Sequence, residues 1–219
     1  MIISDYLILI ADDHPLYRSA LGNIIADSFD DVAVVESEDV ASTVALVLER
    51  SIDLVLLDLS MPDADGLDGL RMLREASPTT PVIICSAMDD PQLVRESFKL
   101  GVSGYLPKSS GEQVTRHALQ LVRSGGVYVP TEALGESIDK KSAQNEGSRQ
   151  AFEDSAMAAL TPRQGAVLSL LERGMSNKLI ARELGIGEIT VKAHVSAILR
   201  KLGVENRVQA VVASRDLRR

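Results

Sequence analysis

Acidic residues follow two short apolar segments in the first half of this 219-residue chain. Asp12 and Asp13 follow the run 6–11, and Asp58 follows the run 54–57. Each run is too short for a buried helix and is typical of a strand covered on both faces. Parallel strands of an open α/β sheet end at one edge, where such sheets keep their ligand crevice, so we expect the three carboxylates to meet there.

Two further polar residues are expected at the same edge, because Ser86 follows the run 81–85 and Lys108 follows the run 104–107. Adjacent carboxylates repel one another unless a cation neutralises them, and carboxylate, carbonyl and water oxygens suit Mg²⁺. Such a site can carry a phosphoryl group on Asp58, with the metal and Lys108 offsetting its charge and Ser86 donating a hydrogen bond. A calcium site is a poorer interpretation, since the spacing lacks the contiguous loop of an EF-hand.

The elements that must position this edge alternate between strand and helix patterns. Besides the four runs above, a short strand is predicted at 32–35. Helices are predicted at about 15–25, 40–48, 65–76, 91–100 and 111–124. Parallel neighbours need crossover connections, so the alternation predicts an α/β fold, a doubly wound (βα)5 parallel sheet.

Helical spacing also predicts which side chains face the core of this unit. On the first helix the predicted inward residues are Leu16, Tyr17, Ala20, Leu21, Ile24 and Ile25. On the last helix they are Val114, Ala118, Leu121 and Val122.

Composition and charge indicate two modules without a membrane segment. The hydrophobic fraction of 45% is enough for a core, and no apolar run approaches the roughly 20 residues of a membrane span. Residues 1–5 have no basic stretch, which argues against a signal peptide, and the single Cys85 excludes an internal disulfide framework. We therefore expect a cytoplasmic protein with no membrane partner.

The net charge of −8 is divided unevenly along the chain. Residues 1–154 have 12 Lys and Arg against 26 Asp and Glu, a net charge of −14. Residues 155–219 have 11 against 5, a net charge of +6. An acidic module joined to a basic one suggests that the second module binds a polyanion such as nucleic acid.

Helix start and stop signals divide the C-terminal part into four helices. The predicted domains are 1–126, a linker at 127–155, and 156–219. Within the last, Thr161-Pro162 begins one helix, Asn177–Leu184 and Glu188–Leu202 form two more around a glycine-containing turn, and a final helix spans Arg207–Leu217. Two short helices joined in this way are typical of a helix-turn-helix.

The second helix of this pair has a polar face. Periodicity places Thr190, Lys192, Ala193 and Ser196 opposite Ile189, Val191, Val195 and Leu199. A helix of this kind fits the major groove of DNA, although a solvated face on a four-helix bundle gives the same pattern.

The acidic motifs resemble the receiver domain of two-component response regulators over residues 5–125. The segments that carry this resemblance are Asp12-Asp13, Asp58-Leu-Ser-Met-Pro-Asp-Ala-Asp-Gly-Leu67, Ser86-Ala87 and Gly-Tyr-Leu-Pro-Lys108. The resemblance implies that Asp58 accepts a phosphoryl group from a histidine kinase. It implies Mg²⁺ as cofactor, held by Asp13, Asp58 and the Ser60 carbonyl with help from Asp12.

The same resemblance assigns two switch residues. Ser86 takes the position of the switch hydroxyl, and Tyr105 that of the aromatic residue whose rotamer follows it. Lys108 stabilises the phosphoryl group, while His14 and His117 are interpreted as packing or surface residues.

The C-terminal helices resemble the LuxR-type DNA-binding domain of NarL/FixJ-type regulators over residues 156–219. The matching segments are Leu160-Thr-Pro-Arg-Gln164, Ser176-Asn-Lys178-Leu-Ile-Ala181 and Thr190-Val-Lys-Ala-His-Val195. By position, Lys192 and Ala193 are expected to contact bases, Thr190 and Lys178 phosphates, and the final helix a second copy of the chain.

At several positions the chain departs from the family pattern, or the pattern does not fix the role of the residue. His194 is expected to face the bundle or the DNA backbone, and Ser196 stands at a DNA-binding position that is basic in some relatives. Gln164 stands where the family often has Glu, which should change one local salt bridge. Gly187 replaces the usual Ser or Thr cap, so the start of the recognition helix should be looser.

Together the two resemblances imply a phosphorylation-switched transcription factor rather than an enzyme. Its expected partners are a sensor histidine kinase, double-stranded promoter DNA, RNA polymerase and, when phosphorylated, a second copy in a homodimer. One alternative is a Mg²⁺-dependent phosphohydrolase with Asp58 as nucleophile, but such haloacid-dehalogenase-type sites need an acid two residues on, where Ser60 stands. The other is a constitutive DNA-binding protein that keeps the receiver only for dimerisation.

Overall fold

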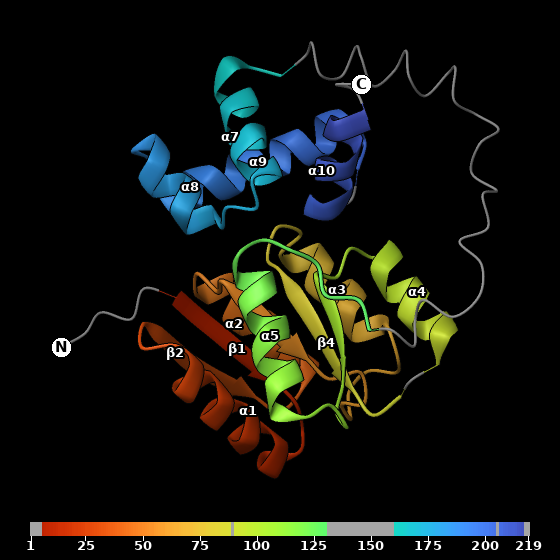
Figure 1. Cartoon of the computed structure of the whole chain (residues 1–219). Helices are drawn as coiled ribbons and strands as arrows, with labels where there is room; N and C mark the ends of the chain where they lie inside the picture. The colour runs from red at the N-terminus through yellow and green to blue at the C-terminus, as the bar shows by residue number, and fades with distance from the viewer. Residues whose placement is uncertain (1–5, 89, 131–159, 205, 217–219) are drawn as a thin grey trace. The chain divides into compact units, whose positions relative to one another are not determined.

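The computed structural model describes residues 6–88, 90–130, 160–204 and 206–216. The chain forms two compact units, Met1–Ala133 and Leu134–Arg219 (Figure 1). The predicted linker at 127–155 lies mostly outside the described residues, so the predicted domain boundaries stay predictions. The described part of that linker packs on the first unit, where the Tyr128 N–H donates to the Ser103 carbonyl at 2.9 Å.

A five-stranded parallel sheet forms the centre of the first unit, with strand order β2-β1-β3-β4-β5. The strands are Tyr6–Ala11 (β1), Val32–Ser37 (β2), Leu54–Leu57 (β3), Val82–Ser86 (β4) and Gly104–Pro107 (β5). The predicted doubly wound α/β fold is therefore confirmed. The winding direction reverses between β1 and β3, which opens the crevice for a ligand at their carboxyl ends.

Helices cover both faces of the sheet (Figure 1). They are Pro15–Ser28 (α1), Val40–Glu49 (α2), Asp68–Ala76 (α3), Pro91–Lys99 (α4) and Glu112–Arg123 (α5). α1 and α5 pack on one face, and α2, α3 and α4 pack on the other. The third helix begins three residues later than predicted, because Gly66 takes a left-handed conformation (φ 54°) that ends the preceding turn.

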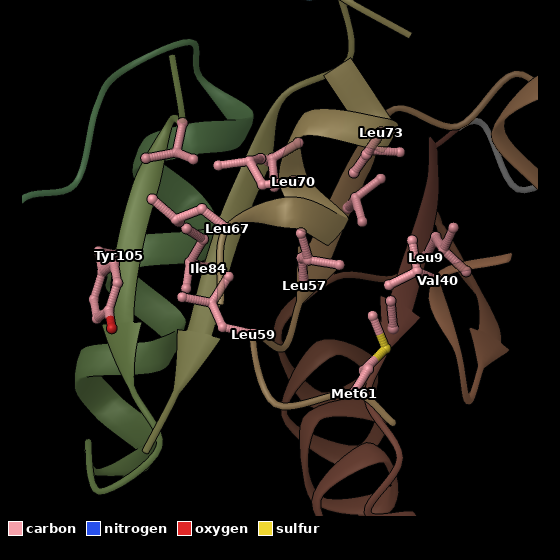
Figure 2. Packing of buried hydrophobic residues seen from close by; sticks show 14 of the residues in the cluster. Leu9, Val40, Leu57, Leu59, Met61, Leu67, Leu70, Leu73, Ile84 and Tyr105 are labelled. Atoms are coloured by element: carbon pink, nitrogen blue, oxygen red, sulfur yellow. The ribbon is translucent and has the colours of Figure 1, made fainter. Parts of the chain in front are cut away.

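Successive strand residues alternate between the two cores. Leu9, Leu57 and Ile84 face the α2–α4 layer, where Figure 2 shows them packed with Leu70 and Tyr105. The residues that precede them on each strand, Ile8, Leu56 and Ile83, face α1 and α5. This period of two fixes the register of the sheet, and with it the positions of the polar residues at the strand ends.

The predicted inward faces of two helices are partly wrong. Val114 and Leu121 of α5 are exposed, contrary to the prediction. Ala118 and Val122 are buried as predicted, and Thr115 and Leu119 are buried with them. The buried stripe of α5 thus keeps two of the four predicted positions and is rotated away from the other two. Leu16 and Ala20 of α1 are also exposed, contrary to the prediction, because the buried residues of that helix are Arg18, Leu21 and Ile25.

The second unit contains four described helices around one apolar core. They are Pro162–Glu172 (α7), Asn177–Leu184 (α8), Glu188–Leu202 (α9) and Arg207–Asp216 (α10). As predicted, Thr161 and Ser176 accept a backbone N–H at the starts of α7 and α8, and Gly185 and Gly203 end α8 and α9 with positive φ. No side chain caps α9 at Gly187, also as predicted.

Gln164 makes two contacts through its side-chain oxygen, and the prediction that it changes one local salt bridge stays a prediction. Its side-chain oxygen accepts from the Thr161 N–H at 3.1 Å and from Lys201 Nζ at 2.8 Å. The uncharged amide therefore completes the capping box of α7 and also ties α7 to α9.

Ile189 does not face the core, contrary to the prediction. The buried stripe of α9 consists of Val191, Val195, Ile198, Leu199 and Leu202. Ile189 is two residues, about 200°, away from Val191 around the helix, and its side chain is therefore exposed.

The core of the first unit can be tested with two substitutions on α3. Leu70→Ala should lower the free energy of unfolding by about 2–5 kcal/mol, because it opens a cavity at a fully buried site. Met72→Ala on the exposed side of the same helix should change it by no more than about 0.5 kcal/mol. Urea unfolding followed by tyrosine fluorescence reports on this unit alone, since it holds all four tyrosines, Tyr6, Tyr17, Tyr105 and Tyr128. Equal effects of the two substitutions would contradict this packing.

Candidate functional site

Asp58 lies at the carboxyl end of β3, in the crevice beside β1. Its backbone N–H donates to the Ala11 carbonyl at 2.8 Å, which continues the pairing of the two strands by one residue. The residue is only 2% exposed. A carboxylate that the sheet forces out of water in this way needs a positive partner.

Lys108 provides that positive charge. Its Nζ lies 2.8 Å from Asp58 Oδ2 and 2.8 Å from Asp12 Oδ2, and its backbone N–H donates to the Ser86 carbonyl at 2.8 Å. Burial by itself lowers the pKa of the ammonium group, but the hydrogen bonds to Asp12 and Asp58 outweigh it and raise the pKa above its ordinary value. Lys108 therefore stays charged throughout the neutral range.

The acidic residues converge as the sequence predicts. Asp12, Asp13, His14 and Asp58 each offer one ligand atom, and these atoms lie within 4.8 Å of one another. Among the described residues, the buried Asp58 Oδ1 has no hydrogen-bond partner. A buried carboxylate oxygen without a donor, next to two further carboxylates, fits a hard divalent cation such as Mg²⁺.

His14 lies at the rim of this cluster. Its Nδ1 is 2.6 Å from Asp13 Oδ1, and its backbone N–H donates to Asp12 Oδ1 at 2.9 Å. His14 and His117 are both exposed, in agreement with their interpretation as surface residues. Ser60, whose carbonyl is the predicted third ligand, is exposed on the segment that leaves β3, and its role stays a prediction.

The two predicted switch residues are bonded to the same neighbour, Met88. The Ser86 Oγ accepts from the Met88 N–H at 3.1 Å, and the Tyr105 hydroxyl donates to the Met88 carbonyl at 2.6 Å. Both side chains are fully buried, and Figure 2 shows the hydroxyl of Tyr105 at the end of its ring on β5. A change at Ser86 can therefore reach Tyr105 through a single residue.

Two residues of α1 support the site, although the sequence assigned neither of them to it. The Tyr17 ring centroid lies 4.9 Å from Lys108 Nζ, a cation–π contact. The buried Arg18 guanidinium donates to the Asp12 carbonyl at 2.7 Å and pairs with Glu36 and Glu38. Helical periodicity placed Tyr17 among the inward residues, and only its position one turn after the acidic pair could have indicated this contact.

In the second unit, the predicted DNA-contacting residues of α9 share an exposed face. Thr190, Ala193 and Ser196 are exposed. Lys192 is less so, since its Nζ lies 3.4 Å from Glu188 Oε1 one turn earlier. Lys178 and His194 are partly exposed.

Family models match both units of the chain. The model described as the response regulator receiver domain matches residues 8–120, and the one described as bacterial regulatory proteins of the luxR family matches residues 158–214. The chain belongs to the response regulators. Its family is a class of transcriptional regulators with a DNA-binding domain rather than of enzymes.

Relatives of known name match nearly the whole length of this response regulator. The glycerol metabolism activator of Pseudomonas putida is 43% identical over 213 residues, which cover 97% of this chain and 96% of that protein. The nitrate/nitrite response regulator protein NarL of Escherichia coli is 33% identical, covering 94% and 93%.

A solved structure shares the fold. RcsB from Salmonella enterica serovar Typhimurium, described as bound to promoter P1flhDC in the presence of the phosphomimetic BeF3⁻, is similar with a TM-score of 0.55 and 23% identity. The match covers 95% of this chain and 97% of that one. In the described part of this chain, every helix is too short or too polar to span a bilayer.

Stability measurements with and without Mg²⁺ can test the metal site. Without metal, Asp13→Asn should raise the free energy of unfolding by roughly 1 kcal/mol, since it removes one of three mutually repelling carboxylates. Mg²⁺ at about 100 times its dissociation constant should stabilise the unsubstituted protein by about 2.7 kcal/mol, and the variant much less at the same concentration. Urea unfolding followed by tyrosine fluorescence measures both effects.

Asp68→Asn is the matched control for this experiment, because Asp68 is an exposed acid on α3 that pairs with Arg71. Its Mg²⁺ response should equal that of the unsubstituted protein. An equal Mg²⁺ response in Asp13→Asn would remove Asp13 from the ligand set.

Proposed function

We propose that a sensor histidine kinase phosphorylates Asp58, and that this switches the binding of the chain to promoter DNA. The observation that carries the proposal is the buried Asp58 Oδ1, which has no hydrogen-bond partner among the described residues, while Oδ2 is held by Lys108. Oδ1 is therefore the oxygen available to attack a phosphoryl group beside the cation, and the contact of Oδ2 with Lys108 fixes its direction. The family of the chain supports the same function.

In the phosphoryl transfer, Asp58 Oδ1 attacks the phosphorus of a phosphohistidine. A P–O bond forms, the P–N bond breaks, and the imidazole nitrogen keeps the electron pair. Asp12, Asp13, Asp58 and the Ser60 carbonyl would hold Mg²⁺, which would neutralise the charge of the phosphoryl group. Lys108 adds a fixed positive charge at the same place, and Tyr17 holds its ammonium group in position.

The switch begins at Ser86, whose hydroxyl donates to a phosphoryl oxygen once Asp58 is modified. Movement of Ser86 changes the hydrogen bond that its Oγ accepts from the Met88 N–H. The change reaches Tyr105 because the Tyr105 hydroxyl donates to the carbonyl of Met88. Tyr105 follows, and the surface formed by α4 and β5 changes with it. The phosphoryl group shifts the population because it is bound better in one of the two arrangements.

The second unit then binds double-stranded DNA with α9 in the major groove. Lys192 and Ala193 contact bases, Ser196 faces the groove, and Thr190 and Lys178 approach phosphates. The charge of +6 on residues 155–219 favours a polyanion. A structure of similar fold is described as two RcsB dimers bound to two parallel DNAs, which supports a homodimer on DNA, formed here through the final helix α10. A further partner of the DNA-bound protein is RNA polymerase at the promoter.

Phosphate labelling tests the role of Asp58. Radioactive acetyl phosphate should label the unsubstituted protein, and Asp58→Asn should abolish the label because an amide oxygen is not a comparable nucleophile. Asp65→Asn, a matched change at an exposed acid on the same segment, should keep it. A label retained in Asp58→Asn would count against this assignment.

The same samples separate the alternatives. Phosphodonor should increase the affinity of the unsubstituted protein for a selected operator, but not that of Asp58→Asn. Equal binding with and without phosphodonor would favour a constitutive DNA-binding protein. Steady turnover of a phosphoester would favour a phosphohydrolase.

The assigned DNA contacts can be told apart by their salt dependence. Lys192→Ala should cost about 1–3 kcal/mol on the operator and relax its sequence preference, whereas Lys178→Ala should weaken all sequences alike and reduce the salt slope by about 1. Fluorescence anisotropy across a salt series measures both, and labelling of Asp58 should be intact in each variant. A purely sequence-independent loss in Lys192→Ala would make Lys192 a phosphate contact.

A further inference from the structure

An exposed isoleucine stands on the helix that is proposed to enter the major groove. Ile189 is 79% exposed, compared with 44% for Leu179 on α8 and 54% for Val212 on α10. Single apolar side chains are normal on protein surfaces, and Leu16 and Leu48 of the first unit are exposed as well, so exposure alone assigns no role. The position of this side chain on α9 therefore decides whether it has a role.

Ile189 lies in line with the other exposed residues of α9. Ala193 and Ser196 follow it at i+4 and i+7, so the three residues form one stripe along the helix, and both are exposed. Thr190, an assigned phosphate contact, is its exposed neighbour. Ile189 also lies in the first turn of α9, and recognition helices contact base edges with their N-terminal residues.

The start of α9 does not need Ile189 for its own stability. An apolar pair that brackets a helix start joins the residue before the cap to the fourth helical residue, and here these are Ile186 and Val191, which both pack in the core. Ile189 is the second helical residue and takes no part in this pair. A β-branched residue at an exposed helix position is also less favourable than alanine.

We infer that Ile189 contacts the C5 methyl group of a thymine in the operator and is a specificity-determining residue for it. The thymine methyl is the apolar group that base pairs present in the major groove, so an exposed aliphatic side chain there selects it by removing both surfaces from water. This inference rests on the proposed DNA-binding function and adds one base to what α9 reads. Lys192 recognises its base by donating hydrogen bonds, whereas Ile189 recognises its base by an apolar contact with the methyl group.

Deoxyuridine substitution tests the contact directly, because it removes only the thymine methyl. The operator is first selected from random duplexes with the full-length protein treated with acetyl phosphate. Each thymine is then replaced singly by deoxyuridine, and the affinities of the unsubstituted protein and of Ile189→Ala are measured by fluorescence anisotropy. Leu48→Ala, which shortens an exposed leucine on α2, is the matched control.

One thymine in each half-site should matter to the unsubstituted protein, with an affinity loss of about fourfold for its methyl group. Ile189→Ala should bind the intact operator on the order of tenfold more weakly and show no further loss at that thymine. Ile189→Val should keep part of the sensitivity, and Leu48→Ala should behave like the unsubstituted protein.

Two results would overturn the inference: unchanged affinity of Ile189→Ala, or the same deoxyuridine sensitivity in both proteins. Either would leave the DNA-binding function standing, because an operator would have been selected. Failure to enrich any sequence, with Asp58 labelled normally, would overturn the DNA-binding function and the contact together.

Discussion

The repulsion among three neighbouring carboxylates is the constraint on which the first unit depends. Asp12 and Asp58 are buried, and Lys108 Nζ lies 2.8 Å from an oxygen of each. One ammonium group cannot neutralise three acids, so the site has an affinity for further positive charge. The same imbalance that lowers stability therefore prepares the site for a divalent cation and for a phosphoryl group bound beside it.

The sheet connects this charge cluster to the surface of the protein. Ser86 at the end of β4 and Tyr105 on β5 are both bonded to Met88, so the site and the neighbouring surface share one residue. On the other side, Arg18 holds the Asp12 carbonyl and Tyr17 holds Lys108. Helix α1 thus fixes the acidic side of the site, while the segment after β4 carries the hydrogen bonds of Met88 through which the proposed switch would act.

In the second unit, the helices differ in how their first turns are capped. Thr161 and Ser176 cap α7 and α8 with their side chains, but Gly187 offers none to α9. Gln164 ties α7 to α9 through Lys201 near the other end of the recognition helix. The N-terminal turn of α9, which carries Ile189 and Thr190, therefore begins without a side-chain cap.

Local signals in the sequence were sufficient to predict the elements and the acidic edge. Proline, glycine and capping residues act within one turn of the chain, so the bounds of α8 and α9 were predicted to the residue, and the apolar runs before Asp12 and Asp58 predicted their strands. Parallel topology then brought the strand ends together, because alternation of strands and helices allows few other arrangements.

Only the tertiary structure decided the rotation of the helices and the contacts across them. Apolar residues on α5 and α9 span more than one stripe, so periodicity alone did not show that Leu121 and Ile189 face outward. The contacts of Tyr17 with Lys108 and of Arg18 with Asp12 depend on side chains that meet across strands and helices. The sequence by itself determined which segments form and where their acids stand, because those signals are local. Which face of each helix is buried follows from packing against elements far away in the chain.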